Sequence, residues 1–472
     1  MDRLNTPAVA VVAYWSCLLA AFVALRLNLS DVQLNIDELI PIKVSEAMRA
    51  RGDLDPNWKF ADLPWFWNRD QYNFYFYNIV AHAVVTLGSW FGAAPLPALR
   101  LANVVFQLCA LGFAVDALRR LGAGAFGVAV GGALLAVAPG LVQDAGMARA
   151  ESLIYLVTAV QVWIVTLRLG EWKRALLFGL VLGIGCAIKV TYLMTGSLLV
   201  VVWLLAWAER PHRWLRGALA LAAGVALGFA AAAPYAVIRP TVLMSGLAAL
   251  AETYNTGLPP HSLQKFDLLQ QVLWIGGYFV QLYGPVLLAA LAAPFLLAGR
   301  ARVLAIAAIV FATLVFVYFV GKSVFFERNF SHVLIPILLA AALAVAGLRP
   351  LAWRLAAAAI LALYMGYWSV QIARATHDRD AIARFEAANG LAPSERLPFD
   401  ASVDRKEPAR CDTISLIDHN DRWTADFLAL LDAQGFVPIA RYRGRFSPLV
   451  TSTLHTYLDS DVHYFRCPES KR

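Results

Sequence analysis

Long apolar runs recur along almost the whole chain, and they constrain its fold more than any other feature of the sequence. An apolar stretch of about 20 residues is long enough to cross a bilayer as a helix. The chain is 60% hydrophobic and only 15% charged, which is far from the composition of a soluble globular protein. We therefore expect an all-α polytopic membrane protein of about eleven spans, at roughly 8–29, 98–118, 125–141, 150–168, 174–188, 192–208, 217–237, 276–298, 303–320, 330–347 and 352–371.

The segment Gln71–Gly92 is open to two interpretations, since it could cross the membrane or lie in the interface as an amphipathic helix. Basic residues favour the second, because they then gather on the cytoplasmic side, as is usual in membrane proteins. With this segment flat and the N-terminus inside, the cytoplasmic loops contain Arg119, Arg120, Lys173, Arg174, Arg210, Arg213, Arg216, Arg300, Arg302, Arg349 and Arg354. The run from Ala8 to Leu27 lacks a small-residue cleavage site and is expected to be the first span.

This topology divides the chain into a membrane domain, 1–371, and a polar domain, 372–472, on the outer side. The membrane domain has two long outer loops, 30–97 and 238–275. The polar domain alternates TISLID, TADFLALLDAQG and FVPIARYRGRF, which predicts strand, helix and strand in a small α/β domain. Cys411 and Cys467 both lie in it, and an even pair in an oxidising compartment predicts a disulfide, two buried thiols being the alternative.

Charged residues collect at the outer ends of the predicted spans, where such groups are costly and are candidates for function. The stretch LNIDELIPIKVSEAMRARGDLD places Asp37 and Glu38 there, and Arg149, Glu151, Lys189 and Arg328 come from distant segments. Cations that hold a phosphate and a carboxylate that accepts a proton suit a site for a lipid-linked phosphate. The net charge of +8 follows from the topology and does not indicate nucleic acid.

The segment NIDELIPIKVSEAMRARGDL resembles the Asp-Glu motif in the first outer loop of GT-C glycosyltransferases, in particular the branch of protein O-mannosyltransferases and aminoarabinose transferases (families 39 and 83). Asn73 and Phe74 depart from that branch, which has Pro-Pro there, and Ala150 replaces its proline. The resemblance covers roughly Asn5 to Trp368. Four more segments resemble motifs of the branch in the same order, namely QYNFYFYNIVAHAVVTLGSWFG, ALLAVAPGLVQDAGMARAESLIYL, GLVLGIGCAIKVTYLM and FERNFSHVLIPILLAAALAV.

This resemblance implies an inverting transfer of a sugar from a polyprenyl-phosphate donor to a hydroxyl of a lipid, glycan or protein, on the periplasmic face of a bacterial inner membrane. It implies no required cofactor and leaves a divalent metal open, and no Cys or His spacing indicates a metal site. Asp37, as the base, and Glu38 are the residues expected to be catalytic. Arg149, Lys189 and Arg328 are expected at the donor phosphate, and Glu151, Tyr72 and His261 around the acceptor.

Simpler roles stand beside these. Asp37 could cap the helix that follows it, and Arg149 or Lys189 could extend from a span end to the interface. Tyr72, Tyr75 and Tyr77 could form an interfacial aromatic belt rather than a platform for a sugar. His82 and His332 are expected to be packing residues, and the loop with Tyr254 and His261 could either close over substrates or be a plain connection.

Three other functions are also compatible with a polytopic chain. A transporter or flippase should show inverted repeats and broken helices near the bilayer centre, whereas the charges here cluster at one face. An O-antigen ligase or polymerase usually concentrates arginine and histidine in one large central outer loop. A degenerate relative acting as a scaffold is the third.

Overall fold

The computed structural model describes residues 6–29, 36–59, 70–206, 212–257, 261–263, 265–377, 381–397, 411–418, 422–444 and 461–471. Arg210 and parts of both predicted outer loops lie outside these ranges. The chain forms two compact units. The first comprises Met1–Leu250, Leu282–Val317 and Arg328–Ser369, and the second comprises Ala251–Gln281, Tyr318–Glu327 and Val370–Arg472. The predicted domain boundary after residue 371 stays a prediction.

Helices account for the membrane part of the chain. Proline begins several of them, at the first-turn position where its missing N–H costs no hydrogen bond. They are α1 (Thr6–Arg26), α2 (Leu39–Arg51) preceded by the short η1 (Ile36–Glu38), α3 (Tyr75–Trp90), α4 (Pro95–Arg120), α5 (Gly124–Ala136), α6 (Pro139–Ala145), α7 (Glu151–Thr166), α8 (Glu171–Ile188), η2 (Val190–Thr195), α9 (Gly196–Ala206), α10 (His212–Ala232), α11 (Pro234–Ile238), α12 (Pro240–Thr256), α13 (Leu268–Leu296), α14 (Gly299–Val320), η3 (Glu327–Phe330), α15 (Ser331–Gly347) and α16 (Leu351–His377).

Each of the eleven predicted spans overlaps at least one of these helices, and the spans 125–141 and 217–237 each cover two α-helices. Within the described residues, seven helices are long and apolar enough to cross a membrane, or eight if the pair α5–α6, bent by 51°, counts as one span. The others are shorter or, like α8, carry several charges in their first turn. A multi-pass membrane protein is therefore confirmed, whereas the number of eleven spans stays a prediction.

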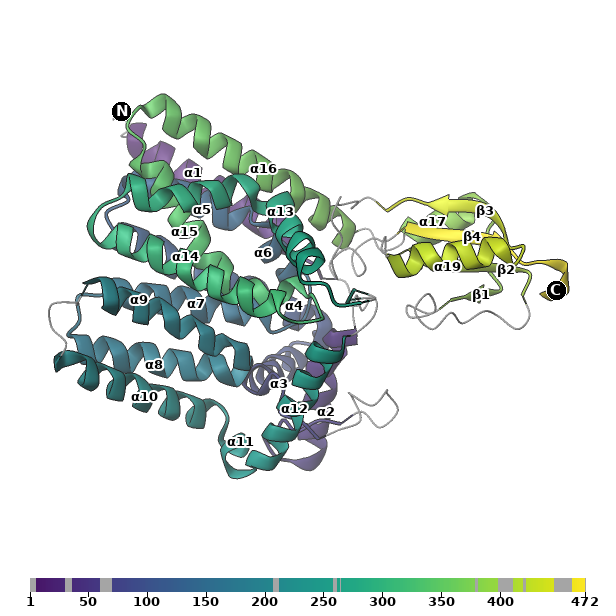
Figure 1. Ribbon diagram of the computed structural model, residues 1–472, viewed down its shortest axis with the longest axis horizontal. Coiled ribbons are helices and arrows are strands. Elements are labelled where there is room, and N and C mark those ends of the chain that lie inside the picture. The colour runs from purple at the N-terminus through teal and green to yellow at the C-terminus, as the bar shows by residue number, and fades with distance from the viewer. Residues whose placement is uncertain are drawn as a thin grey trace. The chain divides into compact units, whose positions relative to one another are not determined.

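The helix α15 forms the centre of the first unit, with 89% of its apolar stretch buried. It packs against α5 and α7, and Figure 1 shows α7, α8, α9 and α10 running alongside one another. The short helices α2 and α3 gather at one end of this group (Figure 1). The residues that line the candidate site described below come from η1, α2, α3, the connection between α6 and α7, the start of α7, and η3.

The helix α3 is the segment whose placement the sequence left open. Its 16 residues fall short of a span, and it is absent from the candidate spans of the described chain. Ala81 and Val85 pack against Leu96 and Leu99 at the start of α4. Its length therefore agrees with the prediction of an interfacial helix.

The C-terminal part of the second unit is the predicted α/β domain. Its four-stranded sheet has the order β1-β2-β4-β3, in which β1 (Glu395–Arg396) is parallel to β2 (Thr413–Asp418) and the other pairs are antiparallel. The predicted strands correspond to β2 and β3 (Val437–Tyr442), and the predicted helix to α19 (Arg422–Ala433). The sequence did not predict α17 (Ala381–Ala388), β1, β4 (Asp461–Arg466) or η4 (Glu469–Lys471). The predicted disulfide between Cys411 and Cys467 is confirmed, and both residues belong to the domain core.

Candidate active site

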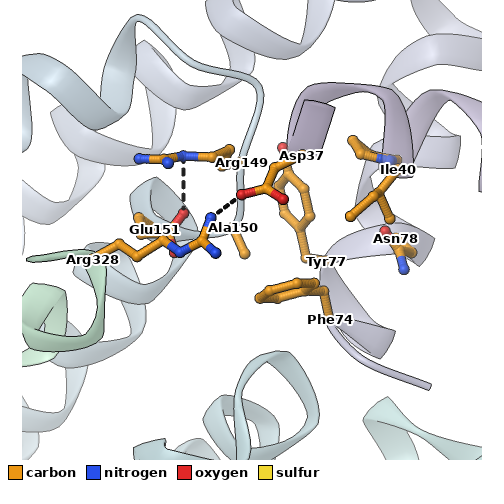
Figure 2. Close-up of a pocket in the computed structure, with 10 residues that line it drawn as sticks. Asp37, Ile40, Phe74, Tyr77, Asn78, Arg149, Ala150, Glu151 and Arg328 are labelled. Carbon is orange, nitrogen blue, oxygen red and sulfur yellow. Dashed lines mark hydrogen bonds and ion pairs between the residues drawn. The ribbon is translucent and has the colours of Figure 1, made fainter. Parts of the chain in front are cut away.

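A pocket lies where η1, α3, the connection between α6 and α7, and η3 meet (Figure 2). Four of the predicted site residues line it, although they are far apart in the sequence. The lining residues are Asp37, Ile40, Pro41, Phe74, Tyr77, Asn78, Arg149, Ala150, Glu151 and Arg328. The fold therefore joins a candidate base, two guanidinium groups and a second carboxylate in one cavity.

Asp37 reaches the pocket from η1, and its side chain is 12% exposed. Its carboxylate forms an ion pair with Nη1 of Arg328, which comes from η3 at the start of α15 (Figure 2). Asp37 is not the N-cap of α2: that position belongs to Glu38, and no side-chain capping bond forms there. The capping alternative is therefore wrong, and the carboxylate faces the pocket and a cation.

Arg149 and Glu151 belong to a buried network of charges. Nη2 of Arg149 donates to Oδ1 of Asp144 at 2.9 Å, and its Nε lies 3.6 Å from Oε2 of Glu151. Lys189 lies 3.8 Å from Oε1 of Glu151, and its Nζ donates to the backbone carbonyl of Arg328 at 3.1 Å. Buried charges are stable only when paired. These residues therefore do not simply extend from span ends to the interface, as the simpler alternative had it.

Lys189 differs from the other predicted cations because it is not among the residues that line the pocket. It follows the end of α8 and contacts Glu151 and the backbone of Arg328. Lys189 therefore contacts two residues of the pocket lining, Glu151 and Arg328, on the side away from the pocket.

Glu38 is buried, with a side-chain exposure of 0%, and does not line the pocket. Its carboxylate accepts two charged hydrogen bonds of 2.9 Å from Nη2 of Arg100, one to each oxygen, and a third of 3.1 Å from Nε. It also accepts the backbone N–H of Ala148 at 2.7 Å. Since Ala148 immediately precedes Arg149, this contact fixes the loop that carries Arg149. We assign Glu38 a positioning role, in place of the catalytic role expected from the sequence.

Arg100 begins a row of polar residues on one face of α4 that the sequence reading missed. Asn103 donates to the carbonyls of Asp144 and Met147, and Gln107 donates to the carbonyl of Leu141 at 2.7 Å and to the Ser152 hydroxyl at 3.0 Å. Their spacing of i, i+3 and i+7 is that of one helix face. Polar groups at this spacing within a span were a usable signal, because intramembrane polar residues rarely lack a partner.

Tyr72, expected at the acceptor, does not line the pocket. Tyr72 packs with Tyr75 in a cluster that includes Ala232 and Ala236, and burial raises its pKa to about 12, with Asp55 adding to the effect. Neither tyrosine lines the pocket. The role expected of Tyr72 is therefore not supported by its position.

His261 belongs to the second unit, where its ring lies 5.0 Å from that of Phe326 and its carbonyl accepts the N–H of Phe325. Its role toward an acceptor stays a prediction. The imidazole of His82 is hydrogen-bonded to Ser45 at 3.0 Å, as expected of a satisfied packing residue. His332 packs against Tyr192 and Phe311, but neither of its ring nitrogens has a hydrogen-bond partner among the described residues.

Phe74 has a backbone conformation that bulky residues rarely adopt. It caps the N-terminus of α3 with φ 58° and ψ 33°, in the left-handed region. Such a conformation costs about 1–3 kcal/mol and persists only where surrounding structure enforces it. It directs the phenyl ring toward the pocket (Figure 2).

The described residues contain no group of three or more His, Cys, Asp or Glu side chains that could hold a metal ion. The carboxylates near the pocket are instead bound by arginine and lysine. Among the residues of the pocket, Asp37 can accept a proton and the guanidinium groups can bind an anion.

Comparison with known proteins gives a fold. No family profile matches the sequence, and no curated protein matches it. The apo structure of ArnT from Cupriavidus metallidurans, an aminoarabinose transferase of the GT-C class, is 16% identical, with a TM-score of 0.58. The similarity covers 97% of this chain and 98% of that one. This chain has the GT-C fold.

A second structure of ArnT, bound to undecaprenyl phosphate, is also similar to this GT-C chain, with 16% identity and a TM-score of 0.55. It covers 96% of this chain and 97% of that one. The fold class expected from the sequence motifs is therefore confirmed. Because nearly the whole chain is covered, the likeness includes the C-terminal domain, for which the sequence showed no resemblance.

Proposed function

We propose that this protein is a membrane glycosyltransferase that moves a sugar from a polyprenyl-phosphate donor to an acceptor hydroxyl, with Asp37 as the base. The observation that carries the proposal is the pocket in which Asp37, Arg149 and Arg328 meet. The GT-C fold supports it, as does the ArnT structure that holds undecaprenyl phosphate.

The proposed reaction needs two kinds of group, and the pocket contains both. Asp37 takes the proton of the acceptor hydroxyl while the acceptor oxygen bonds to the anomeric carbon of the sugar. The bond between that carbon and the phosphate oxygen breaks, and its electron pair leaves with the polyprenyl phosphate. Arg149 and Arg328 stabilise the charge on the departing phosphate. Attack from the side opposite the phosphate inverts the anomeric configuration.

Charge balance indicates how the donor would change the pocket. Four carboxylates (Asp37, Glu38, Asp144 and Glu151) are matched by four cations (Arg100, Arg149, Lys189 and Arg328), as the ion pairs show. A phosphate adds negative charge to this neutral group. Arg328, whose side chain is 16% exposed, can turn from Asp37 toward the phosphate.

The remaining parts of the proposal concern partners and place. The acceptor is a hydroxyl on a lipid, a glycan or a protein, and no cofactor is required. The active face is periplasmic, in a bacterial inner membrane, because the basic loops are then cytoplasmic. A flippase would move the lipid without breaking the sugar–phosphate bond, so bond cleavage separates the two functions.

Replacement of Arg328 tests the phosphate role. The full-length chain in lipid nanodiscs is given bare undecaprenyl phosphate, and binding is measured by native mass spectrometry. Loss of one charged contact should weaken binding by about tenfold or more in Arg328→Gln. Arg239→Gln is the matched control, since Arg239 also pairs with an aspartate, Asp55 at 3.0 Å, but does not line the pocket. Equal affinities in the two variants would remove Arg328 from the phosphate site.

A further inference from the structure

The first turn of α3 forms the side of the pocket that carries no charge. Phe74 is the N-cap of α3 and Tyr77 and Asn78 lie in its first turn, and all three line the pocket. Figure 2 shows Arg149, Glu151 and Arg328 on the opposite side, with Asp37 between the two groups. We call these three residues of α3 the neutral wall.

Two buried polar atoms of the neutral wall have no hydrogen-bond partner among the described residues, namely the Tyr77 hydroxyl and Oδ1 of Asn78. Tyr77 is 3% exposed and Asn78 is 0% exposed. The amide nitrogen of Asn78 is used, because it donates to the carbonyl of Asn73 at 3.2 Å. Buried polar atoms are nearly always paired in folded proteins. Two such atoms at one pocket therefore indicate that a ligand pairs with them.

The chemistry of the two atoms is complementary. Burial raises the pKa of Tyr77 well above its usual range, and the carboxylates of Glu151 and Glu38 raise it further. The phenol consequently stays protonated and can donate a hydrogen bond, whereas the Asn78 oxygen can only accept one. One donor and one acceptor without charge match the hydroxyl groups of a sugar.

The third residue of the neutral wall adds an apolar surface. The ring of Phe74 is held toward the pocket by the left-handed backbone at this position. A flat aromatic ring beside a hydrogen-bonding pair suits a ring that has C–H groups on one face and hydroxyl groups at its edge.

We infer that the neutral wall of Phe74, Tyr77 and Asn78 recognises a polyhydroxylated, uncharged ring within the pocket. This inference rests on the proposed function. Such a ring can come from two sources, the sugar on the donor lipid or a glycan acceptor, and both present the same hydroxyl chemistry.

The test compares two kinds of lipid, undecaprenyl phosphate alone and undecaprenyl phosphate that carries a hexose or a pentose. Their affinities are measured for the full-length wild type, Tyr77→Phe and Asn78→Ala in nanodiscs. If the wall holds the donor sugar, each variant should bind the preferred sugar-bearing lipid about tenfold more weakly. Binding of bare undecaprenyl phosphate should be unchanged, in contrast to Arg328→Gln.

A second arm tests the acceptor as the source. Methyl glycosides of the same sugars are titrated onto protein saturated with undecaprenyl phosphate. If the wall holds an acceptor glycan, the same two variants lose about tenfold in glycoside affinity, and their preference between the two lipids is unchanged. The inference is overturned if the variants bind both the sugar-bearing lipid and the glycoside as tightly as wild type does. It is also overturned if their affinities for the bare and the sugar-bearing lipid fall equally. Wild-type protein that binds neither lipid would refute the proposed function itself.

Phe74→Gly separates a binding role from a structural one. Glycine adopts a positive φ without strain, so the folded state should be as stable as wild type or more stable. Loss of the ring should still lower the affinity for the sugar-bearing lipid or the glycoside severalfold. A loss of thermal stability together with unchanged affinity would show that Phe74 serves packing alone.

Discussion

Asp37 and Glu38 are neighbours in the chain, yet their carboxylates have different surroundings. Asp37 lines the pocket and contacts the partly exposed Arg328. Glu38 is fully buried between Arg100 and the N–H of Ala148. Successive residues of a helical turn point in different directions, so one position is available for chemistry and the other for holding the site together.

Glu38→Gln should be strongly destabilising, because it leaves the guanidinium of Arg100 buried without its carboxylate. Loss of one partner of such a pair costs about 3–5 kcal/mol. The protein should unfold at a markedly lower temperature in detergent, as measured by loss of tryptophan fluorescence or by aggregation.

The double variant Glu38→Leu with Arg100→Leu serves as the control. Removing both charges should recover much of the stability, whereas the loop before Arg149 loses its anchor and activity should stay low. If Glu38→Gln is as stable as wild type, the positioning role of Glu38 is wrong.

Sequence reasoning found the charged residues of the pocket because charges at membrane depth are rare. It assigned Glu38 to catalysis because its partner, Arg100, is 62 positions away and their contact is not visible in the sequence. For Tyr77 the sequence left two interpretations open, an interfacial belt and a platform for a sugar. Its hydroxyl becomes informative only when the pocket around it is known.

At the scale of elements, α8 and α10 pack unusually closely. Gly179 and Gly183 on α8 face Gly224 and Gly228 on α10, and a Cβ at any of the four would lie within 2.4 Å of backbone on the other helix. Small residues four positions apart allow such contact between membrane helices. The sequence contains both glycine pairs, but which helices they join could not be read from it.

Gly183→Ala should separate these helices, since its Cβ would lie 2.3 Å from the carbonyl oxygen of Val225. Overpacking of this kind costs about 1–3 kcal/mol. Because Lys189 follows α8, activity should fall along with thermal stability.

Gly112→Ala is the matched control for that substitution. Gly112 is also inside a helix, α4, but a Cβ there meets nothing within 4 Å. Its melting temperature should equal or exceed that of wild type, because alanine favours the helix. Equal melting temperatures for the two variants would contradict the close packing of α8 on α10.

The predicted span 125–141 proved to be the bent pair α5–α6, and its cause is local. Pro139 lacks an N–H, which leaves carbonyls at the end of α5 without their usual helical partners. Arg26 donates to the carbonyls of Leu135 and Ala136 at 2.9 and 2.6 Å. The proline was visible in the sequence, but a partner on α1 was not.

At the scale of the whole molecule, hydropathy predicted where the helices lie, since each predicted span overlaps at least one helix, although seven or eight of the described helices qualify as spans. Membrane orientation is a different matter, because it depends on the loops and rests on the positions of the arginines. It therefore remains a prediction that can be measured directly.

Thiol labelling measures the orientation. Cys411 and Cys467 form a disulfide, so after reduction both should react with a membrane-impermeant maleimide added to intact cells whose outer membrane has been made permeable. The variant with both residues changed to serine should lose this labelling. Reaction only in inverted vesicles would place the C-terminal domain in the cytoplasm and reverse the topology.

The role of Asp37 as base is tested most directly by the rate at which Asp37→Asn transfers sugar and releases undecaprenyl phosphate. The protein in nanodiscs is given undecaprenyl-phosphate-linked sugars and bacterial membrane vesicles as a source of acceptors, and released undecaprenyl phosphate is quantified by mass spectrometry. Turnover should fall by about 10²–10⁴-fold, the usual contribution of a general base. Asp53→Asn, at an exposed acid paired with Arg51, should keep wild-type turnover. Full turnover by Asp37→Asn would contradict the proposed mechanism.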